Sequence, residues 1–144
     1  EELGGEALSL RGKSAVATAK LAYQRYCERF HGEEFATLRD LGARPQFLLW
    51  ASTGTKNPAY SDLLYVEALI GTETINTLPD GTLDALRDHG RVEASLAADV
   101  DKAAAQYAAL ERHGIDLERV GERLQHEGLQ QFEQAFAALL QLTA

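Results

Sequence analysis

The spacing of apolar residues divides the chain into several helical segments and two short strands. Over most of the sequence, apolar side chains recur every three or four positions, the repeat of a helix with one buried face. This pattern predicts helices over residues 8–30, 33–41, 61–70, 79–89, 98–113, 116–127 and 129–142. Glycine follows most of these segments closely, as is typical of helix ends.

The pattern changes in two places. Residues 46–51 are a continuous apolar run after Pro45, which predicts a strand buried on both faces. Residues 74–78 predict a second short strand. Between them Ser61 is a candidate N-cap, and Pro79 can open the helix after the second strand. Strand, helix and strand in this order predict a parallel crossover unit.

A two-stranded parallel sheet is incomplete, because such strands need further neighbours and helices on both faces. Two interpretations follow. Either the strands are wrongly assigned and the chain is a helical bundle, or the rest of the sheet lies on residues outside this chain. The sequence of 144 residues contains no Met, which favours the second interpretation. We therefore expect the chain to be a piece of a longer protein.

Composition narrows the class of protein. The net charge of −8 disfavours binding to nucleic acids or anionic membranes, which requires a basic face. No apolar run approaches the length of about 18 residues that suggests a membrane span, and the acidic N-terminus predicts no signal peptide. The single cysteine, Cys27, excludes an internal disulfide. It fits a reducing compartment, so we expect a cytoplasmic protein.

The loop after the first predicted strand is the best candidate for chemistry, since ligands of parallel sheets bind beyond the carboxyl ends of strands. It carries hydroxyl, amide and ammonium groups on Ser52, Thr53, Thr55, Lys56 and Asn57. Around it, no acidic residue occurs between Asp40 and Asp62. A glycine-containing turn with a lysine predicts an anion site. The same residues also fit a solvated turn with a surface lysine, the commoner structure for such a segment.

Other candidates are weaker. Trp50 and Asn76 end or lie on the two predicted strands and could line a pocket or simply pack in the core. Cys27 shares an apolar stripe with aromatic residues, which favours a packed thiol. The histidines have no metal-binding spacing, so we predict no metal site. Neither a catalytic triad nor paired carboxylates are recognisable.

Residues 50–62, which read WASTGTKNPAYSD, resemble the strand and loop near the end of bacterial transaldolases of the longer prokaryotic subfamily. Further similar segments occur on both sides of it, in the same order as in the family. They lie at residues 11–17, 21–23, 64–67, 75–79, 88–90, 114–116 and 127–132. The resemblance covers nearly the whole chain.

The resemblance implies an α/β fold, the C-terminal part of a (β/α)8 TIM-type barrel that is mostly helical with two parallel strands. Residues 1–144 would supply strands seven and eight, their helices and the C-terminal helices, with no second domain. Transaldolases transfer a dihydroxyacetone unit between sugar phosphates in the pentose phosphate pathway, through a Schiff base on a lysine and without a cofactor or metal. The implied partners are sugar phosphates and the missing N-terminal part of the barrel.

For the site, the resemblance implies that Ser52 and Lys56 bind the substrate phosphate. Lys56 stands where the shorter subfamily has an arginine, which would grip phosphate through two hydrogen bonds. Further residues are candidates to line the pocket: Trp50, Thr53, Thr55, Asn57 and Asn76. No catalytic residue is expected here, because the family's Schiff-base lysine lies on strand four and its acid–base carboxylates on strands one and three. We therefore expect the isolated chain to be inactive.

Two alternatives remain open. The chain could be a non-catalytic, acidic helical interaction domain in which residues 46–78 form a buried loop region. It could also belong to a protein in which a transaldolase is fused to a glucose-6-phosphate isomerase.

Overall fold

The computed structural model describes residues 4–143. Residues 1–3, part of the N-terminal segment in which we predict no signal peptide, lie outside the described residues. The elements follow one another in the order α1 (Gly5–Leu8), α2 (Ser14–His31), η1 (Glu33–Phe35), α3 (Ala36–Asp40), β1 (Leu48–Trp50), α4 (Leu64–Ala68), β2 (Thr74–Asn76), α5 (Asp80–His89), α6 (Val100–Arg112) and α7 (Leu117–Thr143).

The two strands confirm the predicted parallel crossover. β1 and β2 pair in parallel, with Leu49 opposite Ile75 at the centre of the register. This pairing rules out the purely helical bundle. The prediction that the first strand is buried on both faces is wrong for the described residues, because Leu49, at the centre of β1, is 53% exposed. Its neighbour Ile75 on β2 is 49% exposed. No described element covers the sheet face on which these two side chains lie.

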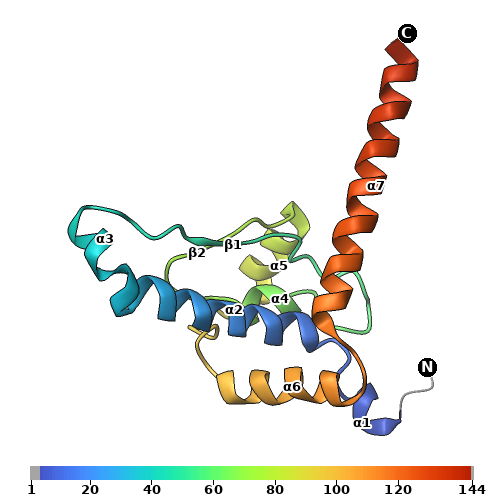
Figure 1. Cartoon of the computed structure of the whole chain (residues 1–144). Coiled ribbons are helices and arrows are strands. Elements are labelled where there is room, and N and C mark those ends of the chain that lie inside the picture. Colours follow the sequence, from blue (N-terminus) through green and yellow to red (C-terminus); the bar gives the residue numbers. More distant parts are fainter. Residues whose placement is uncertain (1–3, 144) are drawn as a thin grey trace.

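Helix α2 forms a middle layer between the two strands and α6 (Figure 1). The core between α2 and the strands contains Tyr23, Tyr26, Leu69 and Leu96, with Trp50 packed against it. Lys20 is also buried, and its Nζ donates to the carbonyl oxygens of Ser95 and Ala98 at 2.7 Å each. These bonds tie α2 to the segment that leads into α6.

The predicted helix over residues 8–30 is wrong at its start. The structure has the short α1, then a turn, and only then α2. The turn contains Gly12 in a left-handed conformation, with φ of 74°. A Cβ atom on Gly12 would lie 3.0 Å from the ring of Tyr60, so this close approach also requires glycine. At the other end, α2 finishes before Gly32 as predicted.

Three helix starts show how capping acts in this chain. The prediction of Ser61 as an N-cap is wrong: α4 begins at Leu64 without a side-chain cap, and the Ser61 hydroxyl instead accepts a bond from the Leu63 N–H. Pro79 does precede α5, as predicted. The predicted cap at Asp116 is also confirmed, because its carboxylate accepts the N–H groups of Glu118 and Arg119.

The last third of the chain differs most from the prediction. Instead of two helices separated at Gly128, α7 runs without a break from Leu117 to Thr143. A glycine inside a helix costs only about 1 kcal/mol relative to alanine, which the surrounding helix-forming residues can offset. The helix projects away from the rest of the molecule (Figure 1), and its apolar residues, including Phe132 and Phe136, are exposed.

Candidate functional site

The site begins where β1 and β2 end side by side. The carbonyl oxygen of Trp50, the last residue of β1, accepts a bond of 3.0 Å from the backbone N–H of Thr77. The Thr77 hydroxyl donates to the same oxygen at 3.3 Å. The carboxyl ends of both strands are therefore joined, and the predicted loop leaves the sheet from this edge.

Backbone geometry at the start of the loop is unusual. Ser52 adopts a left-handed conformation with φ of 57°, which is uncommon for a residue other than glycine, and its side chain is exposed. The next residue, Thr53, is only 3% exposed. Its hydroxyl donates to Oδ1 of Asn76 at 2.7 Å. The chain therefore presents Ser52 outward and returns at once to the end of β2.

The middle of the loop packs against the start of α5. A Cβ atom on Gly54 would lie 3.2 Å from Cγ of Pro79 and 3.3 Å from the hydroxyl of Thr82. Those distances are short for any side chain, so glycine permits the loop to approach the first turn of α5. The N-terminus of this helix carries a partial positive charge from its free N–H groups.

Two cavities open on either side of this loop. The first, of about 490 Å³, lies between the loop, α2 and the region of α4, and the second, of about 530 Å³, lies between the loop and the start of α5. Both are lined by Ser52, Gly54, Thr55 and Lys56. The two predicted phosphate-binding residues, Ser52 and Lys56, thus both border each of these cavities.

The other predicted lining residues divide into two groups. Trp50, Thr55 and Asn57 line the first cavity. The side chains of Thr53 and Asn76 line neither cavity. They lie beneath the loop and are joined to each other by a hydrogen bond. Trp50 Nε1 and Thr55 Oγ1 are fully enclosed and have no hydrogen-bond partner among the described residues.

The structure also brings in residues that the sequence did not single out. Tyr60 and Tyr65 line the first cavity beside Lys56. Asp62 lines the second cavity and carries a charge that would oppose an anion. However, the ring of His89 lies 3.2 Å from Asp62 and 3.1 Å from Asp88. Hydrogen bonds to Asp88 and then Asp62 raise the pKa of His89, which favours the protonated form of the ring beside the Asp62 carboxylate.

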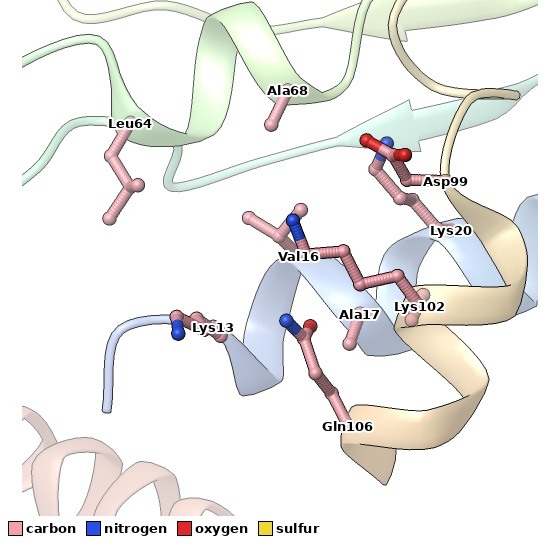
Figure 2. Close-up of a pocket in the computed structure, with 10 residues that line it drawn as sticks. Lys13, Val16, Ala17, Lys20, Leu64, Ala68, Asp99, Lys102 and Gln106 are labelled. Atoms are coloured by element: carbon pink, nitrogen blue, oxygen red, sulfur yellow. The ribbon is translucent and has the colours of Figure 1, made fainter. Parts of the chain in front are cut away.

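A further cavity of about 230 Å³ lies between α2, α4 and α6 (Figure 2). Lys13, Lys20 and Lys102 line it, together with small apolar side chains. Lys20 is only 8% exposed, which is unusual for a lysine. Because two backbone carbonyls occupy its ammonium group, Lys20 acts as a packing anchor between helices.

The remaining polar residues indicate packing and surface roles. Cys27 is a half-buried free thiol beside the main core. Within residues 4–143, no cluster of three or more His, Cys, Asp or Glu side chains could hold a metal ion. None of the described helices is long and apolar enough to cross a membrane.

Parallel strands joined by a helix, with cavities beyond their carboxyl ends, are the arrangement of α/β barrels and related parallel sheets. The comparisons with known proteins define the family. Residues 2–143 match the model of the transaldolase/fructose-6-phosphate aldolase family. The chain belongs to this family, and the predicted fold class, a mostly helical part of a TIM barrel with two parallel strands, is confirmed.

Individual relatives agree. The chain is 64% identical over 135 residues to a transaldolase of Thiobacillus denitrificans, covering 94% of this chain and 38% of that protein. It is 53% identical over 131 residues to a transaldolase of Neisseria meningitidis, covering 91% of this chain and 37% of that protein. For transaldolase 1 of Streptomyces coelicolor the identity is 46% over 136 residues, with coverages of 94% and 36%. The chain therefore spans well under half the length of these relatives.

Proposed function

We propose that this chain is the C-terminal part of a transaldolase, in which it supplies barrel strands seven and eight and the substrate phosphate site. The whole enzyme would transfer a dihydroxyacetone unit between sugar phosphates in the cytoplasmic pentose phosphate pathway. The observation that carries the proposal is the placement of Ser52 and Lys56 on the same two cavities at the carboxyl end of a parallel strand pair. Phosphate sites of such barrels commonly lie after strands seven and eight, near a helix N-terminus.

Chemically, this edge suits a phosphate. Lys56 supplies a full positive charge, the Ser52 hydroxyl can donate a hydrogen bond, and α5 directs its N-terminus toward the second cavity. Lys56 is exposed, and its ammonium group would act as a point charge and not as a planar two-pronged clamp.

The uncovered apolar surfaces also support the proposal. Phe47, Leu49 and Ile75 are each about half exposed although they lie in or beside strands. In an intact barrel, the remaining strands and helices would cover these side chains and remove their apolar surface from water. The apolar side of α7 would be covered in the same way.

Schiff-base chemistry would take place outside this chain. A Schiff-base lysine needs an environment that lowers its pKa. Lys20 is committed to two carbonyl oxygens, and Lys56 belongs to the anion site. Lys13, which precedes α2, and Lys102, on α6, are both exposed.

Trapping of the intermediate tests the proposed reaction. The full-length protein is mixed with fructose 6-phosphate and reduced with borohydride, which converts a lysine Schiff base to a stable secondary amine. We expect one dihydroxyacetone adduct on a lysine outside residues 1–144. Adduct formation on Lys13, Lys20, Lys56 or Lys102, or no adduct at all, would contradict the proposal.

A further inference from the structure

Thr53 lies between the exposed residues of the loop but does not face either cavity. Its side chain is 3% exposed, and its hydroxyl donates to Asn76 Oδ1 at 2.7 Å. A longer contact of 3.5 Å reaches the carbonyl oxygen of Thr77. The Thr53 side chain therefore connects the start of the loop to Asn76, the last residue of β2.

This connection matters because of its neighbour Ser52. The left-handed conformation of Ser52 is unfavourable for a residue with a Cβ atom. Such a conformation persists only when the surrounding structure holds it. On one side of Ser52, the Trp50 carbonyl is bonded to Thr77. On the other side, the side-chain hydrogen bond from Thr53 to Asn76 holds the loop to the end of β2.

The partner of Thr53 is equally suited to this purpose. Asn76 is half-buried at the end of β2, and β1 and β2 are in register up to the pair of Trp50 and Asn76. The position of the Asn76 amide is thus set by the sheet. The hydrogen bond from Thr53 to the Asn76 amide therefore fixes the start of the loop relative to the strand pair.

We propose that Thr53 and Asn76 are positioning residues for the anion site: their side-chain hydrogen bond holds Ser52 and Lys56 in the arrangement that binds the phosphate of a sugar phosphate. This inference rests on the proposed phosphate role of Ser52 and Lys56. Thr53 itself touches no ligand, because it lies beneath the loop. Its contribution is to keep the loop closed against the end of β2.

The test uses the full-length enzyme with fructose 6-phosphate and with unphosphorylated fructose as donors. Thr53→Val keeps the shape of the side chain but removes the hydroxyl, and Thr53→Ser keeps the hydroxyl. We expect Thr53→Val to raise KM for fructose 6-phosphate roughly tenfold, the effect of losing one buried hydrogen bond, with a much smaller change for fructose. Thr53→Ser should restore most of the lost binding.

Two further variants separate positioning from general destabilisation. Asn76→Ala removes the acceptor and should give the same donor-specific change, and it provides the test if Thr53→Val does not fold. The double variant should be no worse than either single variant, since both remove one bond. As a matched control, Thr72→Val removes a side-chain bond of 2.9 Å to Tyr23 at the amino end of β2, and it should leave the donor ratio unchanged.

The inference is overturned if Thr53→Val and Asn76→Ala affect both donors equally, or if they behave like Thr72→Val. Lys56→Ala, measured in parallel, distinguishes the two levels of the proposal. If Lys56→Ala impairs fructose 6-phosphate selectively and Thr53→Val does not, the positioning role alone is wrong. If Lys56→Ala shows no selectivity, the phosphate site and the positioning role both fail.

Discussion

Ser52 and Glu73 have nearly the same backbone conformation at opposite ends of the strand pair. Their φ angles are 57° and 56°, in the left-handed region that residues other than glycine rarely adopt. The Glu73 carboxylate lies 2.6 Å from the ring of His31 and accepts a bond of 2.9 Å from the Tyr26 hydroxyl. The Ser52 hydroxyl has no hydrogen-bond partner among residues 4–143 and lines both cavities.

The comparison shows how one kind of strained residue can serve two purposes. At the amino end of β2, the side chain of Glu73 has a structural role, because it joins the segment that precedes β2 to α2. At the carboxyl end of β1, the side chain of Ser52 remains available to a ligand. Barrels of this type place ligand-binding residues at the carboxyl ends of strands and stabilising contacts at the amino ends.

Electrostatics agree with the structural role of Glu73. Hydrogen bonds from His31 and then from Tyr26 hold the pKa of Glu73 below its ordinary value. Burial of the phenol, reinforced by the bond to Glu73, raises the pKa of Tyr26 to about 12. Both shifts favour the bonded arrangement of a neutral phenol and an ionised carboxylate near neutral pH.

Replacing each strained residue by glycine should separate the two roles most clearly. Glycine tolerates the left-handed conformation, so each change relieves strain and removes one side chain. Ser52→Gly should lower kcat/KM for fructose 6-phosphate roughly tenfold, as expected for one lost hydrogen bond to a charged group, without lowering the melting temperature. Glu73→Gly should lower the melting temperature and leave the preference for a phosphorylated donor unchanged.

Steady-state kinetics and thermal unfolding of the full-length variants check this prediction. The functional role assigned to Ser52 is contradicted if Ser52→Gly destabilises the protein without affecting kinetics. The purely structural role assigned to Glu73 is contradicted if Glu73→Gly alters the donor preference.

A smaller effect is expected from pH. The pKa of Glu73 is lower in the folded protein than its ordinary value of 4.5, so its stabilising contribution is fully present above about pH 4.5. That contribution is lost as the pH falls through the lowered folded pKa, because the carboxylate is then protonated in both states. Glu73→Gln lacks this titration.

Chemical denaturation of both proteins between pH 6 and about pH 3 measures the effect. The stability advantage of the wild-type protein over Glu73→Gln should shrink at the acidic end. An advantage that stays constant over this range would show that Glu73 is not held as a carboxylate by His31 and Tyr26.

Local sequence signals predicted much of the fold. The change from helical to strand periodicity located β1 and β2, and the expected starts after Pro79 and Asp116 are confirmed. The errors arise where distant contacts decide. Gly12 breaks the first helix because it packs on Tyr60 in a left-handed conformation. The predicted helix end at Gly128 is wrong, because this glycine lies inside α7 and does not adopt a left-handed turn.

In the candidate site, too, local sequence signals predict some features and distant contacts decide the others. The position of the loop could be predicted, because a polar segment after a parallel strand lies at the ligand-binding edge. The bond between Thr53 and Asn76 could not, because it depends on how β1 and β2 pair and on the path by which the loop returns. Tyr60 and Tyr65 line the first cavity through the same folding of the loop, which no local periodicity indicates.

The most direct test of a phosphate site at this edge is the donor preference of Lys56→Ala in the full-length enzyme. A charge-assisted hydrogen bond to phosphate contributes about 1.5–3 kcal/mol, so kcat/KM for fructose 6-phosphate should fall by roughly 10- to 150-fold, with little change for unphosphorylated fructose. Equal losses for both donors would contradict the phosphate role of Lys56 and, with it, the functional difference between the two ends of the strand pair.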